Sequence, residues 1–204
     1  MANKDLTLNP KITKAAFEEF MQNGFRKASV HNIAKKAQVT TGALYTRYKN
    51  KDELFCSLIQ NAITAISEKS TQLRTLYDYA AQTKNFDDIF KAMKVEERIH
   101  IETLFEYYEE CQLLFCRSDG SLIEQKLIEC EKLKIKETCS FMEDIAVKKV
   151  DYNVIELIMS QEVEFYRYIL NKGFTKEEAV AFIEKVDLFF EAGWRVIFKE
   201  IMEK

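Results

Sequence analysis

Apolar residues recur every three or four positions along almost the whole chain, which is the pattern of amphipathic helices. The first such stretch covers residues 9–23, where Asn9 and Pro10 supply a cap and a first helical residue. Gly24 is expected to end it, because the residue just past a helix often needs a positive φ. Longer helices are predicted further along, at residues 52–82, 86–92, 95–117, 121–146, 151–172 and 175–203.

Two much shorter helices are predicted between residues 29 and 48. Ser29 is a typical N-cap for the first, and the second runs from Thr41 to Tyr48 after a turn at residues 38–40. Small residues where the two helices meet would allow the close crossing of a helix-turn-helix. The outward face of the second helix is small and polar, as a surface entering a DNA groove must be, and consists of Thr41, Gly42, Ala43, Tyr45, Thr46 and Arg47.

Gly42 stands out within this short helix. Glycine there costs about 1 kcal/mol relative to alanine. Close approach of the backbone to a base or a phosphate would compensate for that cost.

Composition supports an all-α fold. The chain of 204 residues has one proline and five glycines, too few for a turn-rich β fold. No signal peptide is recognisable, and the apolar runs are shorter than the ~20 residues of a membrane span, so a cytoplasmic protein with no membrane partner is expected. The five cysteines are scattered and odd in number, which favours free thiols over a redox or metal role.

Charge is distributed unevenly along the chain. Residues 1–60 contain ten basic and five acidic residues, a net charge of +5. The whole chain carries −3, so the remainder carries −8. A basic N-terminal part on an acidic body fits a protein that contacts phosphates with one end only.

The segment at residues 29–51, SVHNIAKKAQVTTGALYTRYKNK, resembles the DNA-binding domain of the TetR family of bacterial regulators. The matching features are Gly24-Phe25, Ser29-Val30, Ile33-Ala34, Ala37, Val39, Gly42-Ala43-Leu44-Tyr45, Tyr48, Lys51 and Glu53-Leu54. The resemblance covers residues 6–66 closely and implies a helix-turn-helix domain there, followed by a helical effector-binding and dimerisation domain at 67–204. Gln38 departs from the pattern, since the family usually has a turn glycine. A polar residue able to adopt a left-handed conformation is a mild substitute.

The resemblance also implies roles for individual residues. His31, Thr41, Gly42 and Ala43 would face base edges, whereas the residues that position the DNA backbone would be Ser29, Val30, Tyr45, Thr46, Arg47 and Lys51. Tyr45 as a packing residue and His31 as a solvated one remain alternatives. Because so short a helix reads few base pairs, a homodimer on a palindromic operator in double-stranded DNA is expected. The resemblance further implies a repressor whose DNA binding a ligand relieves.

Two features of the second domain are expected to serve dimerisation and effector binding. The two C-terminal helices carry apolar seams that predict a four-helix dimer interface, with plain monomer core as the alternative, through Ile158, Phe165, Ile169, Ile183, Val186, Phe190, Trp194 and Ile197. Aromatic residues of the central helices are candidates for a pocket for a small, largely apolar effector, namely Phe105, Tyr108 and Phe141, although such residues can equally be core.

Catalysis is not expected. The chain has two histidines, no glycine-rich phosphate loop and no nucleophile–base pattern, so no cofactor and no metal site is predicted. His100 with Glu96, Glu97 and Glu102 is interpreted as ordinary helix-surface chemistry. The remaining alternative is a helical ligand-binding or interaction module without DNA affinity, against which the basic N-terminal part argues.

Overall fold

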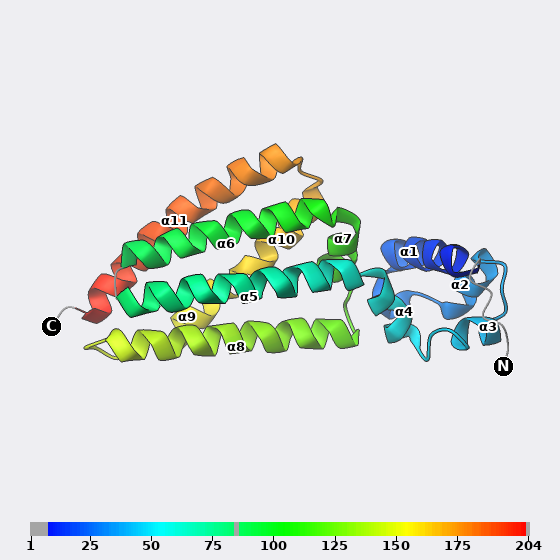
Figure 1. Ribbon diagram of the computed structural model, residues 1–204, viewed down its shortest axis with the longest axis horizontal. Helices are drawn as coiled ribbons and strands as arrows, with labels where there is room; N and C mark the ends of the chain where they lie inside the picture. Colours follow the sequence, from blue (N-terminus) through cyan, green and yellow to red (C-terminus); the bar gives the residue numbers. More distant parts are fainter. Residues whose placement is uncertain (1–7, 84–85, 203–204) are drawn as a thin grey trace. The chain divides into compact units, whose positions relative to one another are not determined.

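The computed structural model describes residues 8–83 and 86–202, and every regular element within those ranges is an α-helix, which confirms the predicted all-α class (Figure 1). The first helices are α1 (Leu8–Lys27), α2 (Val30–Lys36), α3 (Thr41–Tyr45) and α4 (Lys51–Leu58). The others are α5 (Gln60–Thr83), α6 (Phe86–Glu106), α7 (Tyr108–Cys116), α8 (Leu122–Ile145), α9 (Tyr152–Met159), α10 (Gln161–Lys172) and α11 (Lys176–Met202).

Packing divides the chain into two compact units. The N-terminal unit comprises the residues up to Ile63 together with Glu109–Leu127, and the C-terminal unit comprises Thr64–Tyr108 together with the chain from Ile128 onward. The division near residue 63 lies close to the predicted boundary at 66. The return of 109–127 to the N-terminal unit was not predicted.

The returning segment belongs to the N-terminal unit because it completes the end of α1. Gly24 has a φ of 69°, so regular helix stops there as predicted, and the next amide, of Phe25, donates to the carbonyl of Arg117 at 2.7 Å. The Arg117 Nε donates in turn to the carbonyl of Met21 at 3.0 Å. Both bonds satisfy backbone groups that a helix end leaves without intrahelical partners.

The same segment explains why the predicted helix at 52–82 is two helices. The chain leaves helical geometry at Ile59, and α5 begins at Gln60. The carboxylate of Glu110 accepts from the Ala62 amide at 2.8 Å and from the Asn61 side chain at 3.1 Å. A carboxylate there caps the new helix and complements its dipole.

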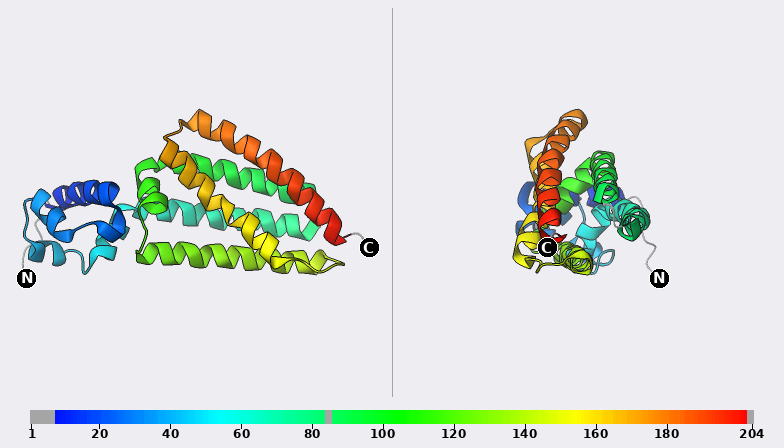
Figure 2. Two further views of the ribbon diagram at one scale, coloured as in Figure 1. Left: turned by 180° about the vertical axis from the view of Figure 1, so that it is seen from behind. Right: turned by 90° about the vertical axis from the view of Figure 1, so that its left-hand side faces the viewer.

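The C-terminal unit is a set of long helices. In Figures 1 and 2, α5, α6 and α8 run nearly along one direction, and α10 and α11 run obliquely to them. Helix α6 is continuous through residues 93–94, which separate two of the predicted helices, and α10 is separated from α9 by Ser160. Within the described residues, no helix combines the length and the apolar character that crossing a bilayer requires.

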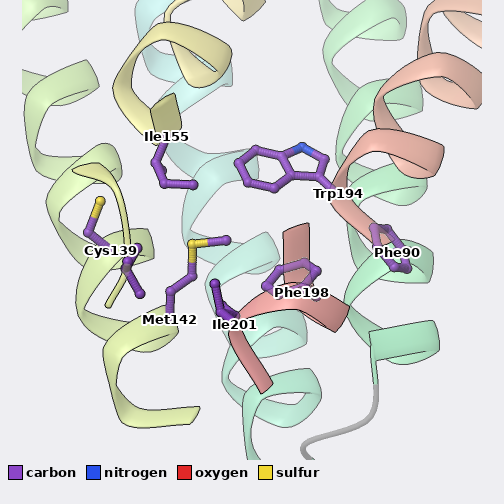
Figure 3. Packing of buried hydrophobic residues seen from close by; sticks show 8 residues of the cluster. Phe90, Cys139, Met142, Ile155, Trp194, Phe198 and Ile201 are labelled. Carbon is purple, nitrogen blue, oxygen red and sulfur yellow. The ribbon is translucent and has the colours of Figure 1, made fainter. Parts of the chain in front are cut away.

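One buried cluster of this unit gathers side chains from four helices, α6, α8, α9 and α11 (Figure 3). Trp194 and Phe198 of α11 lie with their ring centroids 6.0 Å apart and face Met142 and Ile155. These residues bury most of their surface within the single chain, so they stabilise the monomer.

Candidate nucleic-acid interface

The start of α2 is organised by one buried carboxylate. Glu19 of α1 is 2% exposed and accepts from the Ser29 amide at 3.1 Å and from the Lys36 ammonium at 3.2 Å. Burial alone would raise the pKa of Glu19, but the Ser29 amide and the Lys36 and Asn32 side chains hold it below its usual value. This role of Glu19 was not predicted, although an acid on the apolar face of α1 is a sequence signal for it.

The turn between α2 and α3 has the geometry expected of a helix-turn-helix. Gln38 has a φ of 57°, which confirms that a polar residue fills the left-handed position here. The Thr40 hydroxyl then caps α3 by accepting from the Ala43 amide at 3.0 Å. Ile33, Ala34 and Leu44 are buried between the helices, as small and branched residues at a close crossing should be.

Helix α3 presents its outer face to solvent. Gly42, Thr46 and Tyr45 are exposed, the last by 48%, whereas Thr41 and Ala43 are half-buried. Regular helix ends at Tyr45 and not at Tyr48, with Thr46 as the C-cap. A Cβ built on Gly42 would meet only the Thr40 hydroxyl, at 3.9 Å. Nothing within the described structure therefore requires glycine at this position.

The other predicted contact residues lie at the edges of this face. His31 is exposed on α2, and Ser29 and Val30 are half-buried at its start. The Arg47 guanidinium donates to Asn9 Oδ1 at 3.0 Å and to the Ala43 carbonyl at 3.1 Å, so it braces α3 against α1.

The ammonium of Lys51 is also committed within the unit. It contacts the carbonyls of Phe25 at 2.8 Å, Ala28 at 3.3 Å and Arg26 at 3.4 Å, and it lies 4.5 Å from the centroid of the Phe25 ring. Lys51 therefore caps the end of α1. Its predicted role on the DNA backbone has to compete with these contacts.

The predicted dimer residues do not share one face. Ile169, Ile183 and Trp194 are buried inside the single chain, at 0%, 7% and 7% exposure, so the prediction that they meet a partner needs correction. Helical periodicity marked the apolar seam, but that seam faces the monomer core. The other predicted residues are half-buried, namely Ile158, Phe165, Val186, Phe190 and Ile197.

A second apolar stripe on α11 faces solvent instead. Leu188 is 68% exposed, Phe189 75% and Val196 65%, and the small residues Ala192 and Gly193 are exposed between them. A Cβ built on Gly193 would meet no atom within 4 Å. Large apolar side chains in a continuous exposed row mark a surface that associates with another surface.

The predicted effector-pocket residues are not brought together. Phe105 and Tyr108 lie with ring centroids 5.6 Å apart, near the end of α6. Phe141 packs instead beside Ile89 and Ala92, near the start of the same helix. Sixteen residues of α6 separate Ile89 from Phe105, which is about 24 Å at the rise of an α-helix.

The exposed α3, its left-handed turn and its capped neighbour define a helix-turn-helix domain joined to a helical domain. Residues 12–58 match the model of the bacterial regulatory proteins of the tetR family. The N-terminal part of the chain is thus similar to the DNA-binding domain of the TetR family.

Known relatives share either part of the sequence or the whole fold. An uncharacterised HTH-type transcriptional regulator of Bacillus subtilis, YdgC, is 26% identical over 54% of this chain and 52% of its own length. The chain thus spans about half the length of that curated relative. The fatty acid degradation regulator FadR of Bacillus halodurans has a similar structure, with a TM-score of 0.57 at 16% identity over 90% of this chain and 98% of that one. FadR of Bacillus subtilis, solved in complex with stearoyl-CoA, is similar with a TM-score of 0.54 at 17% identity. That match covers 90% of this chain and 98% of the FadR chain.

Proposed function

We propose that the protein is a transcriptional repressor that binds a palindromic operator as a homodimer and is released by a small, largely apolar effector. The observation that carries the proposal is the exposed outer face of α3, with Gly42 and Tyr45 at its centre. A free helix face of this size and polarity fits the major groove, which admits one α-helix. Binding to chromosomal DNA would require the protein to act in the cytoplasm.

The braced basic residues support this assignment in a particular way. Arg47 and Lys51 fix the position of α3 relative to α1 and α4 through their contacts with Asn9 and the α1 carbonyls. A recognition helix needs such bracing, because base-edge hydrogen bonds depend on its orientation. Sequence choice is then assigned to the exposed residues of α3 and to His31 of α2.

The homodimer is proposed to form through the exposed stripe of α11 and not through the buried seam. Leu188, Phe189 and Val196 supply large apolar surface, and Ala192 and Gly193 between them allow a second helix to approach closely. Fully burying one such large side chain contributes about 1.5–3 kcal/mol. A second copy of the chain offers the same stripe, so the contact is self-complementary under two-fold symmetry.

Selection of bound duplexes from random DNA fragments tests the proposal. Recovered sites are expected to be inverted repeats, and affinity for the best site should fall steeply with salt as phosphate counterions are released. Tyr45→Ala should weaken binding by about tenfold or more, equivalent to about 1.4 kcal/mol. Tyr79→Ala is the matched control, because Tyr79 is 61% exposed on α5, outside the N-terminal unit.

Two results would overturn the proposal. One is a selection that enriches no sequence, or only sites without symmetry. The other is salt-insensitive binding that Tyr45→Ala leaves unchanged, which would favour an interaction module without DNA affinity.

A further inference from the structure

A network of charged and phenolic side chains joins four helices inside the C-terminal unit. Glu96 of α6 and Glu162 of α10 both accept from the ammonium of Lys134 of α8, at 3.0 and 2.7 Å. The Tyr77 hydroxyl of α5 donates to Glu96 at 2.5 Å. His100, one helical turn after Glu96, lies 3.4 Å from Glu162. The sequence interpretation of His100 as surface chemistry is therefore wrong, since its side chain is 17% exposed and meets a residue 62 positions away.

Three of these side chains have the types and spacing of metal ligands. One donor atom each from Glu96, His100 and Glu162 lies within 4.8 Å of the other two. The 4.0 Å between His100 Nε2 and Glu96 Oε1 is somewhat longer than the edge of a tetrahedron around a zinc ion, about 3.4 Å for bonds of about 2.1 Å.

The hydrogen bonds around His100 also leave one ring nitrogen available to bind a metal ion. The Tyr166 hydroxyl donates its single hydrogen to Glu162 at 3.1 Å, so towards His100 Nδ1, 2.7 Å away, it acts as an acceptor. Nδ1 thus carries the hydrogen, and in the neutral ring Nε2 keeps its lone pair on the side of Glu96, 4.0 Å from Oε1. Histidine ligands usually have this arrangement, with the other ring nitrogen held by a neighbouring acceptor.

Lys134 occupies the place of a cation between the two carboxylates. Its ammonium pairs with Glu162 at 2.7 Å and with Glu96 at 3.0 Å. The Lys134 side chain is 42% exposed, so it borders solvent and has room to turn outward.

We propose that Glu96, His100 and Glu162 bind a first-row divalent transition metal ion, which replaces the ammonium of Lys134. One imidazole and two carboxylates are a donor set that suits Zn²⁺, Co²⁺ or Mn²⁺. Two carboxylates with one ammonium leave a net charge of −1, and a divalent ion in its place brings the site to zero. Metal binding breaks the ion pairs through which Lys134 links α8 to α6 and α10.

The test is a titration of the purified, DNA-free protein with Co²⁺ and Zn²⁺, followed by calorimetry and by the visible spectrum of bound cobalt. One ion per chain is expected, with a cobalt spectrum that lacks the thiolate charge-transfer band of cysteine ligation. Glu162→Gln and His100→Gln should each weaken binding by about tenfold or more. Glu102→Gln, at an exposed position of α6, should leave the affinity unchanged.

Lys134→Met is the decisive variant, because it separates a ligand site from a structural ion-pair network. Removal of the competing ammonium should tighten metal binding, by about tenfold if Lys134 occupies the site nine-tenths of the time. Unchanged or weaker binding in Lys134→Met would overturn the proposal. So would metal uptake that survives both ligand variants or shows thiolate bands.

Metal binding is measured without DNA, so it stands or falls separately from the proposed function. A second measurement, the operator affinity of the metal-loaded protein, rests on that function. A change in operator affinity with the metal, absent in Glu162→Gln, would identify the ion as an effector.

Discussion

Replacing Gly42 by alanine should strengthen the fold and weaken DNA binding at the same time. Alanine is favoured over glycine in a helix by up to about 1 kcal/mol. Gly42 is the second residue of α3, where part of that preference applies, so we expect a stabilisation of about 0.5 kcal/mol. The new Cβ would lie 3.9 Å from the Thr40 hydroxyl, an ordinary contact, and the bond from Thr40 to Ala43 is undisturbed.

The effect on DNA follows from the open space above Gly42. The added methyl group occupies volume that the proposed complex needs for close approach of the α3 backbone to the duplex. Loss of one specific contact costs about 1–3 kcal/mol. Operator affinity should therefore fall by about tenfold or more, in the opposite direction to stability.

The assay combines urea unfolding with fluorescence anisotropy on the selected operator at a fixed salt concentration. Ser140→Ala is the control, because Ser140 is an exposed position inside α8, where alanine gains helix propensity, and it lies outside the N-terminal unit. The control should gain a few tenths of a kcal/mol and keep full affinity. Gly42→Ala with unchanged affinity would refute the reasoning, since the glycine would then have no role in DNA approach.

Three further predictions concern other parts of the chain. Lys51→Met should destabilise the protein by about 2 kcal/mol in urea unfolding, because charged hydrogen bonds to carbonyls at the end of α1 are lost. The control Lys49→Met, at an exposed position, should have little effect on stability. Equal effects of the two variants would contradict the capping role of Lys51. Glu97 has its pKa raised to about 10 by burial, its bond to Asp187 and nearby carboxylates, so its folded state holds a proton that the unfolded chain releases near pH 4.3. Stability should therefore fall as pH rises between about 4.3 and about 10, and Glu97→Gln should flatten that slope in thermal melts; an unchanged slope would exclude Glu97 as its source. Phe189→Asp should convert the proposed dimer to a monomer in sedimentation, whereas Leu133→Asp, on the exposed side of α8, should not. A dimer in both variants would place the interface elsewhere.

The parts of the structure that depend only on residues close together in the sequence could be predicted from it. Ser29 as a cap and Gly24 as a helix end follow from local backbone chemistry, and both are confirmed. Gln38 adopts the left-handed turn without a glycine, as the pattern around it required. These features fix the helix-turn-helix, because its length is only a few residues and its hydrogen bonds are local.

Features that depend on distant residues were not predicted. A lysine that starts α4 gives no sign that its ammonium reaches the carbonyls of Phe25 and Ala28, more than twenty positions earlier. Trp194 was assigned to a partner because periodicity identifies an apolar face without telling which body covers it. In α11 two apolar stripes exist, and only the packing of the monomer shows which one remains open.

The ion-pair network around Lys134 could not be predicted from the sequence pattern. The free-energy cost of burying its charged groups is nevertheless informative about its role. Replacing a buried ion-pair group by well-packed apolar residues is often neutral, or stabilising by about 1–4 kcal/mol. Glu97 adds to the cost, since one of its carboxyl oxygens is buried without a hydrogen-bond partner among the described residues. Stability alone therefore does not account for this concentration of charge between α6, α8 and α10. A site that exchanges one cation for another does account for it, because two carboxylates and an imidazole must then stay ionisable and only partly buried.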